Sequence, residues 1–449
     1  MTAVGRAWRR VTLPGKVVLV LAALAVVGSG LLAAAAVALG PPIVAFLEAN
    51  LPLVRFVVAA TAVLLLTVPT AFLIIYMEMK VIALMNLRIG PDRVGPFGTA
   101  LSVVHGLKVL AKEDFTPTGA DPVVFTMAPV VVFMATVMSL LVIPFAPGLF
   151  GQDFNIALLY FFAVGGFTVV GLLMGGWASF NKYSLLGGLR SAAQIVSFEI
   201  PLVLSAAGVV MLAGTMSLNG IVERQAGSIL DWYVWQQPLA FLVFFIAATA
   251  EANRTPFDLT EADSEIVAGF ATEYSGMRFG FFFFAEYVNV FVVSALATTL
   301  FFGGWNAPFD WPWPVTLALD PGSLGILLLV GLAVVPVVGT LVFAAPFWLA
   351  RSDWPTWQAL LAGFVVFNLV AVAAVLGWAF VSFDWVVGLA WFMAKTYLFV
   401  FVFVWLRATL PRVRIDQLMD FAWKWLMELA FLNMFVTAGA LLVVDQLRG

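Results

Sequence analysis

Long apolar runs are the feature that most limits the folds open to this chain. Runs of about 20 or more mostly apolar residues recur along its 449 residues, and only 10% of the residues are charged. A run of that length can cross the hydrocarbon core of a bilayer. Because lipid offers the backbone no hydrogen-bond partners, each crossing run must be a helix. The sequence therefore predicts an all-α polytopic membrane protein rather than a soluble enzyme.

Eleven runs are long enough to be transmembrane helices. A basic segment precedes the first run, as it would precede a signal peptide, but the run is long for one and we expect it to be retained. The predicted spans are residues 17–40, 54–83, 122–147, 155–180, 192–215, 236–252, 277–303, 323–349, 357–383, 385–407 and 422–446.

The distribution of basic residues predicts the orientation of these spans. With the N-terminus in the cytoplasm, all but four of the 22 Lys and Arg residues fall on inner segments or inner helix ends. Cytoplasmic loops of membrane proteins carry such an excess. We therefore expect a cytoplasmic N-terminus and an acidic inner loop at 253–276. The exceptions are Arg55, Arg224, Lys395 and Arg448.

The chain contains no Cys and a single His. Without Cys it can hold neither an iron–sulfur cluster nor a disulfide, and one His cannot supply a bis-histidine haem. Electron transfer in this system must therefore use centres on other chains or a diffusible organic carrier.

Residues 251–280, EANRTPFDLTEADSEIVAGFATEYSGMRFG, are unusually acidic for a segment between apolar runs. Apolar side chains such as Phe257 and Ile266 alternate with the acids, which a solvated connector would not need. This mixture predicts a loop that docks against another protein while it lines a polar chamber. Its six acids are Glu251, Asp258, Glu261, Asp263, Glu265 and Glu273.

Ionisable residues also lie inside the predicted spans. At about 1.5 Å per residue, Glu199 and Glu286 lie about 12–14 Å from the inner surface and Lys395 about 18 Å. A charge at the bilayer centre costs at least about 2.5 kcal/mol, so such groups usually face a wet or protein-lined interior. Two interpretations stay open, a path of titratable groups for protons or a set of structural ion pairs. The same choice applies to Glu78 and Glu251, nearer the inner ends of their spans.

A turn rich in Gly and Pro, IGPDRVGPFG, precedes a segment with apolar residues at helical spacing from Phe97 to Leu110. The segment is too short and too charged to span, which predicts a helix at the membrane interface or against a partner. It carries His105, which near neutral pH can be a proton donor or simply a polar residue on the helix surface.

Several motifs in order resemble the H subunit of respiratory complex I, the NADH:quinone oxidoreductase. The resemblance runs over about residues 54–304 and 385–446. It implies eight core spans, so that 1–53 and 310–384 are additions to a core at 54–309 and 385–449. The motifs are MEMKVIALMNLRIGPDRVGPFG, GWASFNKYSLLGGLRSAAQIVSFEI, EANRTPFDLTEADSEIVAGFATEYSG, AEYVNVF and WLRATLPRVRIDQLM.

The resemblance implies that the chain forms the membrane floor of a quinone chamber and the first stage of proton coupling. The chamber residues would be Glu78, Lys80, Arg88, His105, Arg254, Phe257, Asp258, Glu261, Asp263, Glu265, Glu273 and Tyr274. The proton path would continue through Glu199, Glu251, Glu286, Tyr287 and Lys395.

The chain departs from the family pattern at several chamber-side positions. Met79 stands where the family usually has Arg, Leu101 and His105 replace Gln and Asp, and Thr260, Asp263 and Ala271 change the acidic motif. These departures leave open an altered quinone or a related complex with another electron donor.

The resemblance also implies partners and a location. FMN and iron–sulfur clusters would lie on partner subunits, with no cofactor bound by this chain alone, quinone as the substrate and the cytoplasmic membrane as the site of action. Two alternatives remain: the equivalent subunit of a membrane-bound hydrogenase-type complex, and a stand-alone ion-coupled transporter. The chain shows no internal repeat of the kind that builds many transporters.

We predict that the isolated polypeptide is redox-silent, because it lacks the Cys and His ligands that clusters and haems require. The test is visible absorption and metal analysis of the chain purified alone. A haem or cluster present at one per polypeptide would contradict the prediction.

Overall fold

The computed structural model describes residues 51–258, 268–309 and 384–448. The predicted spans 17–40, 323–349 and 357–383 lie outside these residues, as do Glu261, Asp263 and Glu265. Nearly all of the described residues belong to one compact unit formed by Arg55–Trp311 and Val387–Gly449. The division of the chain into a core and additions remains a prediction.

The regular elements in the described part are helices, with no β-strand among them, which confirms the all-α prediction. The longer ones are α3 (Leu51–Met85), α4 (Leu101–Ala111), α5 (Pro122–Leu140), α6 (Ala157–Ala178), α7 (Lys182–Ala213), α10 (Pro238–Glu251), α12 (Gly276–Phe301), α16 (Asp384–Thr409) and α18 (Met427–Arg448). Short helical segments are η1 (Pro96–Gly98), α8 (Leu218–Glu223), η2 (Ile229–Asp231), α9 (Tyr233–Gln236), η3 (Gly269–Ala271), α17 (Ile415–Phe421) and the π-helical turn Ala422–Leu426.

Seven stretches of the described part are long and apolar enough to cross a membrane. They lie in α3, α5, α6, α7, α12, α16 and the continuous stretch Ile415–Val444. The run predicted at 236–252 is also helical, but α10 has only 14 residues. The number of crossings and the side of the N-terminus remain predictions.

Two helix boundaries differ from the sequence expectation for local reasons. Helix α5 ends at Leu140 rather than at 147, because Pro144 lacks a backbone N–H and disfavours helical geometry in the preceding residue. Helix α7 begins at Lys182 rather than at 192, because Asn181 caps it by accepting a 2.9 Å hydrogen bond from the Tyr183 N–H. Hydropathy alone does not predict that the helix starts at Lys182, because the first turns of α7 contain polar residues.

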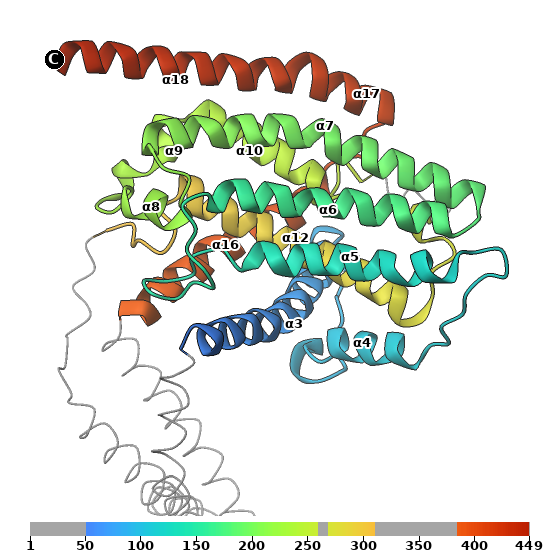
Figure 1. The fold of residues 1–449 in the computed structure, drawn as a ribbon. Helices are drawn as coiled ribbons and strands as arrows, with labels where there is room; N and C mark the ends of the chain where they lie inside the picture. Colours follow the sequence, from blue (N-terminus) through green and yellow to red (C-terminus); the bar gives the residue numbers. More distant parts are fainter. Residues whose placement is uncertain (1–50, 259–267, 310–383, 449) are drawn as a thin grey trace, which may run out of the picture. The chain divides into compact units, whose positions relative to one another are not determined.

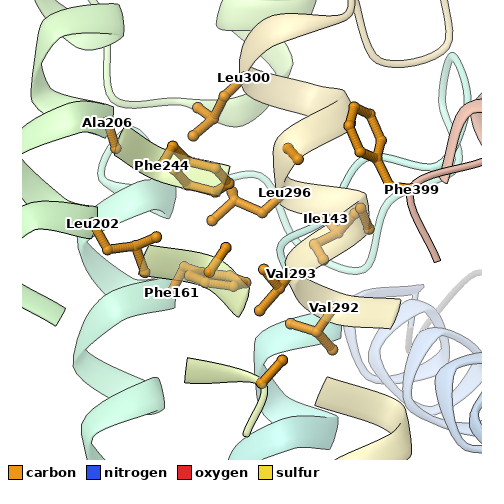
Figure 2. Packing of buried hydrophobic residues seen from close by; sticks show 14 of the residues in the cluster. Ile143, Phe161, Leu202, Ala206, Phe244, Val292, Val293, Leu296, Leu300 and Phe399 are labelled. Atoms are coloured by element: carbon orange, nitrogen blue, oxygen red, sulfur yellow. The ribbon is translucent and has the colours of Figure 1, made fainter. Parts of the chain in front are cut away.

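Helices α5, α6 and α7 lie side by side, with α10 and α18 packed on α7 and α12 on α5 (Figure 1). Helix α12 is the most enclosed of the apolar stretches. In the most apolar 18 residues of α12, 61% is buried, whereas in the most apolar 18 residues of Ile415–Val444 the buried share is 17%. Figure 2 shows Leu296 and Leu300 of α12 near Phe244 of α10, in the same apolar cluster as Leu202 of α7. Polar residues of α12 therefore enter a protein interior rather than lipid.

The helix predicted after the Gly- and Pro-rich turn is present as α4, and its place at the membrane interface or against a partner remains a prediction. Its apolar side chains Val104, Leu107 and Leu110 are 43–59% exposed, so they do not contribute to the core of this chain. On the other side of the helix, Gly106 lies against the Phe72 ring of α3, where an added Cβ would come within 3.0 Å. The helix thus packs on the chain through a small residue and presents an apolar face outwards.

We predict that Gly171→Ala destabilises the packing of α6 on α5. A Cβ at Gly171 would lie 2.4 Å from Val132 Cγ2 and 3.2 Å from the Ala128 carbonyl oxygen, which forces the helices apart. Overpacking of this kind costs about 1–3 kcal/mol, measured as thermal unfolding in detergent. The matched control is Gly439→Ala, because a Cβ at Gly439 meets nothing within 4 Å. Equal unfolding temperatures for the two variants would contradict the prediction.

Candidate functional site

A buried carboxylate joins three segments that are distant in the sequence. Glu78, near the C-terminal end of α3, pairs with Arg254 in the turn after α10 at 3.2 Å and with Arg407 of α16 at 2.6 Å. The Glu78 side chain is 10% exposed and that of Arg254 is 4% exposed. Each carboxylate oxygen takes a different guanidinium, so one acid holds two cations.

Arg254 is the hub of this cluster. Its guanidinium carbon lies 4.3 Å from the ring centre of Tyr287 on α12, a cation–π contact. Burial disfavours its charge, but the neighbouring acids Glu78 and Glu286 outweigh that effect, and the pKa of the guanidinium lies above its ordinary value. Arg254 is therefore a permanent cation. It can set the local potential but cannot carry protons.

The turn that carries Arg254 is held from both sides. The Gln194 side-chain amide, on α7, donates to the Ala250 and Phe257 carbonyl oxygens, each at 2.7 Å. Asp258 at the end of the turn pairs with Arg412 at 3.2 Å. These contacts fix the first eight residues of the acidic segment, and with them the position of Arg254.

Two of the predicted path acids lie beyond this cluster, on α10 and α7. A Cβ added at Gly165 of α6 would lie 3.8 Å from Glu251 Oε1, and one added at Gly166 would lie 3.9 Å from Glu199 Oε1. Both carboxylates therefore face the same short stretch of α6. The Glu251 Oε2 atom is buried and has no hydrogen-bond partner in the described part of the chain.

A second group of contacts anchors the far end of the acidic segment. Tyr274 stacks on Phe125 of α5, with ring centres 4.0 Å apart, and its hydroxyl donates to the Phe125 carbonyl at 3.0 Å. Burial raises the pKa of the Tyr274 phenol, although nearby Arg278 offsets part of the effect. Glu273 accepts a 2.6 Å hydrogen bond from Asn181. These residues hold the loop on α5 and α7, apart from the Glu78 cluster.

Three further predicted chamber residues lie near the C-terminal end of α3 or on α4. Lys80 lies over the Tyr76 ring at 6.0 Å, and Tyr76 in turn donates to the Phe97 carbonyl at 3.1 Å. Arg88, just after α3, and His105, on α4, are exposed. Their assignment to a quinone chamber stays a prediction.

Lys395 lies at the other end of α12 from Glu286. Its Nζ donates to the carbonyl oxygens of Phe302 at 2.7 Å and Asn306 at 2.8 Å, and lies 4.7 Å from the Trp232 ring centre. A cation is stabilised at a helix C-terminus and over an indole. Because none of these partners is a carboxylate, the place of Lys395 in the proton path stays a prediction.

Sequence reasoning missed three residues of the site. In the sequence, Arg407 and Arg412 belong only to the excess of basic residues that predicts orientation, and uncharged Gln194 has no signal beyond its place in a family-like motif. The available clue was the motif WLRATLPRVRIDQLM, whose cations follow an apolar span directly. No group of three or more metal-binding side chains occurs within the described ranges.

Known proteins match most of the chain. A family model described as NADH dehydrogenase matches residues 57–438. The NADH-quinone oxidoreductase H subunit of Brevibacillus brevis is 42% identical over 385 residues, which cover 85% of this chain and 92% of that protein. The corresponding H subunit of Geobacillus kaustophilus is 43% identical over 378 residues, with 84% and 91% covered. That of Dehalococcoides mccartyi is 40% identical over 379 residues, with 84% and 85% covered.

We predict that Glu78→Gln destabilises the chain strongly, because it leaves two guanidinium groups without their carboxylate. Removing one partner of a buried pair costs up to about 3–5 kcal/mol. The measurement is thermal unfolding in detergent. Asp420→Asn is the matched control, since its pair with Lys424 is about two-thirds exposed and contributes little. Similar losses in both variants would show that the Glu78 cluster is not a stabilising centre.

Proposed function

The chain belongs to the NADH dehydrogenase family, as the H subunit of an NADH-quinone oxidoreductase, and we propose that its buried Glu78 cluster lies at the floor of the quinone chamber. The observation that carries this proposal is the continuity of charged groups. From the turn at 254–258, acids and cations extend through Glu78 and Glu286 to the carboxylates on α10 and α7.

Quinone reduction takes up electrons and protons in equal number, so a quinone site needs a route for protons and a means of sensing charge. The electrons would come from centres on partner subunits. In this chain, Arg254 supplies a permanent positive charge beside titratable acids. When the charge on a bound quinone changes, the protonation of the nearest carboxylates responds, because a neighbouring charge shifts their pKa.

The acids are arranged so that a change in protonation near Arg254 can pass to the carboxylates on α10 and α7. Glu286 lies close enough to Arg254 to interact with its charge. Glu251 lies beside Gly165 of α6. Glu199 lies beside the next residue of that helix, Gly166. In this proposal Glu286, Glu251 and Glu199 take up and release protons in turn, and the Glu78 cluster transmits the charge change to them.

The same proposal includes the partner subunits of the chain and its location. FMN and iron–sulfur clusters lie on partner subunits, quinone reaches the chamber from the lipid, and the complex lies in the cytoplasmic membrane of the cell. The names of the relatives favour a quinone as electron acceptor over hydrogenase-type chemistry.

We predict that Glu199→Gln and Glu286→Gln each reduce quinone-linked turnover and proton pumping by about tenfold, which corresponds to a barrier about 1.4 kcal/mol higher. The amide keeps the shape of the side chain and removes the proton site. Assembly should remain normal. The measurement is NADH-driven quinone reduction and proton uptake in reconstituted vesicles.

The matched control is Glu223→Gln, since Glu223 is an exposed acid at the end of α8, outside the stretches that can cross a membrane. Normal turnover and normal proton stoichiometry in both path variants would assign these acids a structural role and overturn the proposal.

A further inference from the structure

Helix α4 packs against the start of α12 (Figure 1), and a charged side chain fastens the segment that follows α4 to the same place. Arg278, in the first turn of α12, pairs with Asp114 at 3.2 Å and donates to the Thr116 hydroxyl at 2.7 Å. Its guanidinium carbon lies 5.3 Å from the ring centre of Phe125 on α5. One cation therefore joins residues 112–116, helix α5 and the start of α12.

The backbone at the start of α12 approaches the same segment closely. The Ser275 hydroxyl donates to the Glu113 carbonyl oxygen at 3.1 Å. Gly276 has a φ of 56°, in the left-handed region that Gly adopts without strain. A Cβ added there would lie 3.2 Å from the carbonyl oxygens of Lys112 and Glu113. The residues at 275–276 thus permit a contact that a larger side chain would disturb.

The core of the chain holds α4 itself only weakly. Of the residues of α4, only Ser102 is buried, and the helix rests on α3 and α12 through small residues. Gly106 lies against the Phe72 ring, and a Cβ at Gly280 of α12 would lie 2.9 Å from Val109 Cγ1. Because little apolar surface of α4 is buried, the contacts at its C-terminal end matter for where the helix lies.

The same contacts also connect α4 to the acidic segment. Ser275 and Arg278 follow Tyr274 directly, and Tyr274 stacks on Phe125, the ring beneath Arg278. The end of the acidic segment and the segment after α4 therefore share one anchor. A displacement at this anchor changes the position of α4, and with it that of His105 and of the outward apolar face.

We infer that Arg278 and Ser275 are positioning residues that form a latch with Asp114, Thr116 and the Glu113 carbonyl. The latch holds α4 in the position in which the complex binds quinone. The inference rests on the proposed function, in which this chain forms the floor of a quinone chamber. Since the latch contains none of the path acids, releasing it weakens quinone binding and leaves the later steps unchanged.

The first experiment measures how fast a maleimide reagent modifies Val109→Cys in the assembled complex. The native chain has no Cys, so modification of this chain, resolved on a gel, reports position 109 alone. Val109 is half-buried against Gly280, and a released α4 exposes it. We expect Arg278→Gln to raise the modification rate of Val109→Cys about threefold or more, because a partly protected group reacts through local opening.

The second experiment measures the apparent KM and kcat for a decyl-tailed benzoquinone or naphthoquinone, whichever the unmodified complex reduces faster. We expect Arg278→Gln to raise the KM about three- to tenfold and to leave kcat within about twofold, the pattern of lost binding rather than lost chemistry. The thermal unfolding temperature should change little, because the Arg278–Asp114 pair is partly exposed. A general packing defect would lower the unfolding temperature and kcat together.

A double-mutant cycle tests whether the two charged residues act as one pair. Asp114→Asn alone should also raise the KM. The double variant Arg278→Gln with Asp114→Asn should raise it no further than the larger single effect, because the pair is lost only once. Effects that multiply would show that the two residues act independently, and the latch would be wrong.

The controls separate position from charge and from assembly. Arg224→Gln removes an exposed cation at the end of α8 and should behave as the unmodified chain. Ser275→Thr keeps the hydroxyl and should retain the KM, whereas Ser275→Ala should raise it. NADH oxidation with a soluble electron acceptor should be normal in every variant, because it bypasses the membrane subunit and reports assembly. If Arg278→Gln does not assemble, Ser275→Ala against Ser275→Thr decides by the same criteria.

Two results would overturn the inference. An unchanged modification rate of Val109→Cys would mean that the latch does not hold α4, and a faster rate with an unchanged KM would mean that the position of α4 does not affect quinone binding. Glu286→Gln, measured in parallel, tests the proposed function separately. If that variant is impaired while the latch variants are normal, the proposed function stands without the latch. If that variant is normal while the latch variants show both effects, the proton path fails and the latch remains.

Discussion

The double ion pair of Glu78 is the interaction on which the candidate site depends. One carboxylate, almost enclosed, holds Arg254 from the acidic segment and Arg407 from α16. Buried charges are tolerated only when they are paired, and an unpaired guanidinium here would cost several kcal/mol. The chain must therefore bring α3, α16 and the turn after α10 to one place, and this requirement positions the rest of the site.

Helix α16 connects that cluster to the opposite end of the bundle. Its last turn carries Arg407, and twelve residues earlier Lys395 binds the carbonyls that follow α12. Helix α16 thus links the middle of α12, where Tyr287 lies against Arg254 of the Glu78 cluster, with the residues that follow its C-terminal end, which Lys395 binds. This arrangement limits sliding of α12, which carries Glu286, relative to α10, which carries Glu251. A short gap between acids can be kept only if the helices hold their register.

Small residues have a function at this centre that large ones could not replace. Packing on α6 is tight at Gly171, where a methyl group would collide with α5, yet loose at Gly165 and Gly166 beside the carboxylates. The same residue type thus permits close helix contact in one place and leaves space beside a carboxylate in another. All three glycines belong to the same regular helix, α6. The residues of the neighbouring helix therefore decide which effect each glycine has.

The sequence by itself determined the class of structure and the positions of the acids along their helices. Length and hydropathy predicted helices such as α6 and α12, since lipid imposes helical structure on apolar runs. The sequence predicted the end of α5 and the start of α7 less well, because Pro144 and Asn181 set those boundaries. The tertiary structure alone decided that Glu78 pairs with a residue 176 positions away, that Gln194 clamps the Arg254 turn, and that Lys395 lies apart from the carboxylates. Pairing of charges depends on which helices pack together, and local patterns of polarity do not contain that information.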